Sequence, residues 1–133
     1  MSTVKELLQE KGGHIFSIEP EASVYEALKI MAEKNVGALA VMEKGKMVGI
    51  FSERDYARNS IEETRNHADI PVSDLMTSDV ITATADWTME QCMEVMTMKH
   101  IRHLPISEHG RLIGLITSGD VGKKIITDLK RSG

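Results

Sequence analysis

The chain is poor in several residue types, and each shortage excludes certain kinds of structure or function. Its 133 residues include one cysteine, three prolines, one tryptophan, two tyrosines and two phenylalanines. The single cysteine, Cys92, excludes an internal disulfide and fits a reducing compartment. No apolar run approaches the roughly 20 residues of a membrane-spanning helix, and the N-terminus lacks a basic segment followed by an apolar stretch. We therefore expect a soluble, cytoplasmic protein without a membrane segment.

An excess of positive charge is also missing. The formal net charge is -4, with charged residues making up 27% of the chain. Without a broad basic surface, no DNA or RNA partner is expected, and any phosphate must be held by a few local basic side chains. The hydrophobic content of 41% supports a core in a chain of one domain's length. Two halves that share one core fit these values better than two independent domains.

What the chain does contain is a repeat. Residues 15–58 and 80–123 superimpose at a constant offset of 65 without a gap, so that Gly49 falls on Gly114 and Asp55 on Asp120. Self-similarity at a fixed period indicates a duplicated supersecondary unit, which generally cannot bury its apolar face without its twin. The function is therefore to be sought between the two copies.

Each copy begins with a β-rich run and a helix. The β-rich runs are 14–18 and 80–83, and each helix follows a hydroxyl N-cap, Ser23 or Thr88. Glu or Gln stands three residues after each cap, which is the pattern of a capping box. Apolar residues then recur at i, i+3, i+4 and i+7, as in an amphipathic helix that faces a core.

Each copy ends with a hairpin and a second helix. Glycine at the hairpin tips, Gly45 and Gly110, supplies the positive φ that tight turns require. The order of elements is therefore β-α-β-β-α. The strands are expected at 39–42, 47–51, 104–106 and 112–116, and the last helices at 52–55 and 117–120 onward.

The segments outside the repeat also carry a pattern. Residues 4–8 resemble 72–76 at an offset of 68, because Gly12 and Gly13 add length before the first strand. The polar stretch 59–70 reads as a frayed helix end and a linker, and 130–133 as a disordered tail. We place the first motif with its N-terminal helix at 1–66 and the second with its C-terminal helix at 67–133.

Three kinds of segment make the chain resemble the CBS (cystathionine β-synthase) domain family. They are the V-x-D-L-M segment at 72–76, the I-R-H-L-P-I strand at 101–106, and the two G-h-h-[ST]-x-x-D stretches at 49–55 and 114–120, where h is hydrophobic. Residues 51–58 further resemble small, free-standing prokaryotic CBS-pair proteins without an enzyme domain. The resemblance implies an α+β fold: two tandem β-α-β-β-α motifs, related by a pseudo-twofold axis and packed as one CBS pair, or Bateman module.

The resemblance also implies an adenosine nucleotide, AMP, ADP, ATP or NAD(H), in the cleft between the two motifs. A carboxylate there can accept two hydrogen bonds from a ribose diol, and a helix N-terminus favours a nearby phosphate. Carried over by position, the ribose residues are Asp120 and Thr117 in one cleft and Asp55 and Ser52 in the other. The base pockets are Ile15, Phe16, Val36, Gly37 and Ala38, and then Val80, Ile81 and Ile101 with Arg102 and His103. Arg102, His103 and Arg54 are expected to converge on phosphates.

Simpler roles compete with these assignments. Ser or Thr followed three residues later by Asp is itself a helix-capping pattern that needs no ligand, and both roles can coexist. Arg54 and Arg58 can equally lie on a solvated helix face. His100, His103 and His109 suggest a metal site only superficially, since no cysteine joins them, and no metal is expected.

Nothing in the sequence indicates catalysis. Cys92 lies in an apolar helical stripe and is a poor nucleophile, and no Ser-His-Asp order or Walker loop is present. We expect a non-enzymatic regulatory module that binds an adenosine nucleotide and, by the family resemblance, forms a homodimer and acts on a further protein. One alternative is a protein-interaction adaptor with empty clefts, and another is an enzyme with a hidden nucleotide-hydrolysing activity.

Overall fold

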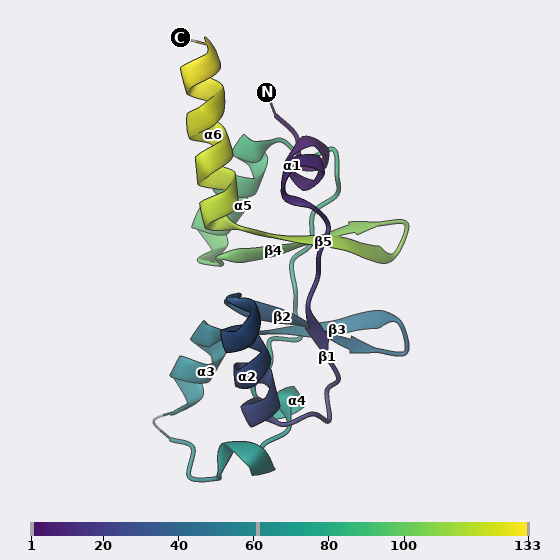
Figure 1. Ribbon diagram of the computed structural model, residues 1–133, viewed down its shortest axis with the longest axis vertical. Helices are drawn as coiled ribbons and strands as arrows, with labels where there is room; N and C mark the ends of the chain where they lie inside the picture. The colour runs from purple at the N-terminus through teal and green to yellow at the C-terminus, as the bar shows by residue number, and fades with distance from the viewer. Residues whose placement is uncertain (1, 61, 133) are drawn as a thin grey trace. The chain divides into compact units, whose positions relative to one another are not determined.

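The computed structural model describes residues 2–60 and 62–132, and they form two compact units (Figure 1). One unit is Phe16–Val80, and the other joins the residues up to Ile15 with those from Ile81 onward. Each unit contains an antiparallel hairpin and helices packed against it. The α+β class and the tandem arrangement of two copies are thereby confirmed.

The first unit is built on a three-stranded sheet in the order β1-β2-β3. β1 pairs with β2 in parallel, and β2 pairs with β3 antiparallel, with a bulge between Val41 and Met42. The predicted helices and hairpin are therefore present, while the first strand is shorter than the expected 14–18. The elements are β1 (Ser17–Ile18), α2 (Val24–Lys34), β2 (Ala38–Glu43), β3 (Lys46–Ser52), α3 (Glu53–Ser60), the 3-10 helix η1 (His67–Asp69) and α4 (Val72–Leu75).

The second unit repeats this plan with a two-stranded sheet, β4-β5. Its hairpin carries a bulge between Ile106 and Ser107, in register with the bulge of the first copy. In Figure 1, α6 runs alongside α5, and the two helices are in contact. The elements are α1 (Val4–Lys11), α5 (Met89–Lys99), β4 (His103–Glu108), β5 (Arg111–Thr117) and α6 (Ser118–Ser132).

The strand expected at 80–83 was wrong, and a proline explains why. In the first unit the Ala40 amide donates a 3.1 Å hydrogen bond to the Phe16 carbonyl. The residue in register with Ala40 is Pro105, which has no N–H to donate, so the equivalent bond cannot form. Only Ala83 pairs with the hairpin, through a single parallel bridge to Ile106.

Caps and turns form where the sequence places them. The Glu26 amide donates to the Ser23 hydroxyl at the start of α2, and Thr88 and Gln91 form a full reciprocal capping box at the start of α5. At the hairpin tips, Gly45 and Gly110 have φ values of 79° and 76°. The residue before each of these glycines also has a positive φ, so both turns suit the twist of the flanking strands.

The segments that precede the copies are exchanged between the units. α1 precedes the first copy but buries Val4 and Leu7 in the core of the second, while α4 buries Val72 and Leu75 in the core of the first. The compact units therefore divide at 15/16 and 80/81. The division of the chain into motifs at 1–66 and 67–133 stays a prediction. The resemblance of 4–8 to 72–76 reflects these matching positions.

The expectations for two segments outside the repeat, 59–70 and 130–133, need correction. The segment 59–70 is more than a polar linker, because it contains η1 and ends at Ile70, which is buried in the core and accepts a 2.8 Å hydrogen bond from the Val24 amide. The disordered tail expected at 130–133 was wrong as far as Ser132, because α6 continues to that residue. Gly133 lies outside the described residues, as does Ile61 within the predicted linker.

Candidate functional site

The two [ST]-x-x-D turns lie between the end of a strand and the start of a helix, as expected: one between β3 and α3, the other between β5 and α6. At the start of α3 the Ser52 amide donates to Oδ2 of Asp55, and the Asp55 amide donates back to the Ser52 hydroxyl. Thr117 and Asp120 form the same reciprocal pair at the start of α6, with distances of 2.9 and 3.0 Å. The capping role is therefore confirmed in both copies, and any ligand role must be additional to it.

Asp55 is enclosed by its own unit. The residue is 7% exposed, and its Oδ2 accepts hydrogen bonds from both the amide and the hydroxyl of Ser52. Its Oδ1 accepts a 2.8 Å hydrogen bond from the hydroxyl of Thr77, which follows α4. Both carboxylate oxygens are thus engaged by neutral donors inside the protein, which favours a structural role for Asp55.

Asp120 is less enclosed and has a charged neighbour. Its side chain is 28% exposed, and its Oδ2 accepts hydrogen bonds from the Thr117 amide and from the ammonium of Lys11 at the end of α1. Partial burial raises the pKa of the Asp120 carboxyl, but Lys11 and Thr117 lower it, and on balance its pKa lies below the usual value. Oδ1 takes part in none of these hydrogen bonds.

A main-chain hydrogen bond joins each turn to the loop before the hairpin of its own unit. The Glu53 amide donates to the Gly37 carbonyl at 3.0 Å, and the Ser118 amide donates to the Arg102 carbonyl at 2.9 Å. Gly37 and Arg102 occupy matching positions, so glycine stands beside the start of α3 where a large, charged residue stands beside the start of α6.

The predicted base-pocket residues divide between the units. Residues of the first unit are Phe16, Val36, Gly37, Ala38 and Val80, whereas Ile15, Ile81 and Ile101 belong to the second. Phe16 and Val36 pack on the first core, while Ile81 and Ile101 pack on the second. The Lys34 ammonium lies 5.6 Å from the centre of the Phe16 ring. That either set binds a base stays a prediction.

The predicted phosphate residues are divided in the same way. Arg102 is exposed and His103 half-buried at the start of β4, and Arg54 is exposed on α3 of the other unit. The structure therefore brings Arg102 and His103 together as chain neighbours, and the convergence of all three stays a prediction.

Two partners of the aspartates were missed in the sequence, Lys11 and Thr77. Thr77 carries no signal of its own, because a threonine after a short helix is common in loops. For Lys11 a signal exists: the extra residues before the first strand allow α1 to run for 8 residues where α4 has 4. This added length carries Lys11 to the turn that contains Asp120.

Residues 2–60 and 62–132 give little support for a metal site, a reactive cysteine or a membrane-spanning helix. Within them no three His, Cys, Asp or Glu side chains gather where they could hold a metal ion, and His100 instead ends α5 in the left-handed conformation. Burial, assisted by the charge of Glu90, raises the pKa of the Cys92 thiol to about 11. No helix in this part of the chain is long and apolar enough to cross a membrane.

Comparison with known families decides what this duplicated unit is. The family model described as "CBS domain" matches residues 4–62 and again residues 72–126. The chain belongs to the CBS-domain family. Two consecutive matches confirm the tandem resemblance inferred from the repeated turns.

Similar proteins support the same fold. A CBS-domain protein from Burkholderia ambifaria MC40-6, to which signal transduction is provisionally ascribed, is 38% identical with a TM-score of 0.91 over 96% of each chain. The CBS pair of protein MJ0100, solved with 5′-methylthioadenosine and S-adenosyl-L-methionine, is 25% identical with a TM-score of 0.84 over 96% of this chain and 98% of that one. The mitochondrial CBS domain-containing protein CBSX3 of Arabidopsis thaliana is 33% identical, and the match covers 94% of this chain and 65% of that protein.

Proposed function

We propose that this CBS pair is a non-enzymatic regulatory module that binds an adenosine nucleotide (AMP, ADP, ATP or NAD(H)) and holds the ribose diol on Asp120. The observation that carries the proposal is the unequal enclosure of the two matching aspartates. Asp55 is buried with both oxygens engaged, whereas the Asp120 side chain keeps 28% of its surface exposed.

The chemistry of the Asp120 turn suits a ribose phosphate. A carboxylate can accept one hydrogen bond from each hydroxyl of a vicinal diol, and Oδ1 is the oxygen that Thr117 and Lys11 leave out. The positive end of the dipole of α6, a helix of 15 residues, favours negative charge at the same place. The adenosine ligands of MJ0100, a member of the same family, support this ligand class.

Regulation follows from differential binding. A nucleotide that binds one arrangement of the CBS pair more tightly than another shifts the population toward that arrangement by its difference in affinity. A partner protein that contacts the altered surface then reads the nucleotide level. Ligand binding also raises the melting temperature, because the ligand binds the folded state only.

The test is a thermal-shift screen of AMP, ADP, ATP and NAD(H) against the wild-type protein and Asp120→Ala. We expect at least one nucleotide to raise the melting temperature of the wild type and to have a much smaller effect on Asp120→Ala. Asp128→Ala is the matched control, because Asp128 lies two turns further along α6 and its carboxylate is 3.9 Å from Lys124. An equal shift in all three proteins contradicts the ribose assignment.

The same screen separates the alternatives. No shift with any nucleotide favours an adaptor with empty clefts. Mass spectrometry of the nucleotide after incubation addresses the hidden hydrolase, because a hydrolysed product overturns the non-enzymatic assignment.

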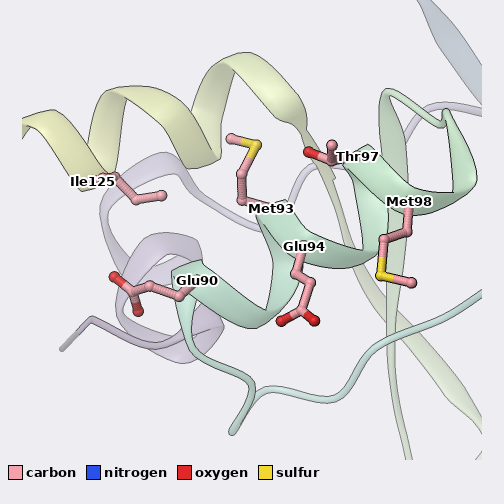
Figure 2. A pocket seen from close by; sticks show the side chains of 6 residues that line it. All are labelled: Glu90, Met93, Glu94, Thr97, Met98 and Ile125. Carbon is pink, nitrogen blue, oxygen red and sulfur yellow. The ribbon is translucent and has the colours of Figure 1, made fainter.

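We further propose that a second copy of the chain packs on the helices α5 and α6. Met98, Ile126 and Leu129 are 67%, 55% and 66% exposed, which is unusual for large apolar side chains. Figure 2 shows Met93 of α5 extending toward α6 beside Ile125, in a groove of about 370 Å³. Light scattering is expected to show a dimer in the wild type and a monomer in Ile126→Glu, and a concentration-independent wild-type monomer contradicts this.

A further inference from the structure

The ammonium of Lys11 holds the carboxylate that the proposed function assigns to ribose. It donates to Oδ2 of Asp120 and also to the Leu115 carbonyl at 3.1 Å, on β5. The Lys11 side chain is 30% exposed, so the ion pair lies at the surface of the unit, where a ligand has access to it.

The capping of the turn does not require this cation. In the first unit the matching aspartate is satisfied by the neutral hydroxyl of Thr77 and by Ser52. The second unit thus has the same cap with a positive charge added, placed by the longer helix α1. Since the first unit forms the same turn without a lysine, folding alone does not explain the presence of Lys11 beside Asp120.

The backbone around Lys11 is constrained by its neighbours. Gly12 ends α1 with a φ of 89°, and its amide donates to the Leu8 carbonyl. A Cβ added at Gly13 would lie 3.2 Å from the Ile113 carbonyl oxygen, so the chain passes tightly against β5. Any response of Lys11 to a ligand is therefore a movement of its flexible four-carbon stem.

From this geometry we propose that Lys11 is a specificity residue that makes the Asp120 site prefer phosphorylated adenosine over neutral or cationic adenosine compounds. The inference rests on the proposed ribose site. A neutral nucleoside that binds Asp120 must share the carboxylate with the ammonium, or displace it without offering another anion. A phosphate supplies that anion, and charge-assisted hydrogen bonds are the strong ones.

The same charge acts against other family ligands. S-adenosyl-L-methionine carries a sulfonium and an ammonium cation beside a single carboxylate, so its net charge is positive, and 5′-methylthioadenosine has no anionic group. Neither brings the Lys11 ammonium the negative charge of a phosphate. Their presence in MJ0100 concerns that protein. In this chain we expect AMP to bind more tightly than adenosine, 5′-methylthioadenosine or S-adenosyl-L-methionine.

The experiment is calorimetric titration of the full chain with AMP and with adenosine, in the wild type and in Lys11→Met. We expect the wild type to favour AMP by about tenfold or more, the usual worth of one charged contact. Lys11→Met should reduce this ratio to about threefold or less, since adenosine gains affinity and AMP loses it. Lys5→Met is the control, because Lys5 is an exposed lysine on the same helix, and it should keep the wild-type ratio.

A second variant separates charge from fold. Lys11→Gln keeps a neutral donor, as Thr77 provides in the first unit, and should lose the discrimination as fully as Lys11→Met. An unchanged ratio in Lys11→Gln, with both ligands still bound, overturns the role of Lys11 and leaves the ribose site intact. Failure of the wild type to bind AMP, ADP, ATP, NAD(H) or adenosine overturns the proposed function, and the inference with it.

Discussion

The hydroxyl of Thr77 donates a 2.8 Å hydrogen bond to Oδ1 of Asp55, while Ser52 engages the other carboxylate oxygen. This link ties the segment after α4 to the start of α3 within one unit. Both carboxylate oxygens of Asp55 are thereby engaged within the unit, which favours a structural role, and the expected ribose role of Asp55 and Ser52 stays a prediction.

We therefore predict that Asp55→Ala is destabilising. Removing the buried carboxylate takes the shared acceptor away from the half-buried Ser52 and the exposed Thr77. Losing these hydrogen bonds to a charged group should cost about 1.5–3 kcal/mol. Urea denaturation should show a lowered free energy of unfolding, and Asp120→Ala should show a smaller loss because its site is open to water. Equal losses in the two variants would contradict the structural role assigned to Asp55.

Gly49 and Gly114 occupy matching positions on β3 and β5, but we predict that replacing them by alanine costs different amounts of stability. A Cβ on Gly49 would lie 2.7 Å from Sδ of Met76 and 2.8 Å from the carbonyl oxygen of Thr77, whereas one on Gly114 would lie 2.6 Å from Cδ2 of Leu8. A flexible side chain can give way more easily than a main-chain carbonyl. Gly49→Ala should thus cost about 1–3 kcal/mol and Gly114→Ala less, measured as free energies of unfolding.

Gly45→Ala and Gly110→Ala serve as controls for these variants, since a Cβ there meets nothing within 4 Å and only the positive φ is strained. Their costs should resemble one another. A larger loss for Gly114→Ala than for Gly49→Ala would contradict the tighter approach of Met76 and Thr77, which follow α4.

The reactivity of the Cys92 thiol reports whether the core of the second unit is exposed to solvent. Its thiol is completely buried, and burial together with Glu90 raises its pKa to about 11. The thiolate fraction at pH 8 is therefore very small, and we expect negligible reaction with a thiol reagent until the protein unfolds. Labelling followed by mass spectrometry across a urea series checks this. Rapid modification of the native protein would contradict the burial of Cys92, a residue of α5, in the core of the second unit.

Acid should weaken the second unit through Asp120. Because the folded pKa of Asp120 is lowered, this carboxylate contributes stability above the ordinary pKa of aspartate, about 3.9, and loses it as the pH falls through the lowered value. Lys11→Met removes a main cause of the lowering, so its stability should fall less steeply between neutral pH and acid. Melting temperatures at several pH values measure the difference, and parallel curves for both proteins would contradict the ion pair.

Much of the fold was predictable because it depends on local chemistry. Ser23 and Thr88 cap helices through their own side chains, and Gly45 and Gly110 adopt the φ that their turns need. Such features are set by residues three or four apart. The repeat then predicted the matching helices and hairpin of the second copy, although not the loss of the strand that Pro105 prevents.

The remainder depends on contacts between distant parts of the chain. The exchange of α1 and α4 is set by which core accepts their apolar faces, and the motif similarity of 4–8 and 72–76 does not reveal it. The Lys11–Asp120 pair spans more than a hundred residues, and no spacing rule predicts it. For the same reason the sequence marked Asp55 and Asp120 as equals, whereas their surroundings make them different.

The most direct test of the account compares AMP with 2′-deoxy-AMP in the wild type and in Asp120→Ala. If the Asp120 carboxylate accepts a hydrogen bond from the ribose 2′-hydroxyl, the wild type should bind AMP about 10- to 100-fold more tightly than the deoxy compound, as expected for a hydrogen bond to a charged group. Asp120→Ala should bind both nucleotides weakly and about equally. Discrimination in Asp120→Ala as strong as that of the wild type would contradict the central claim.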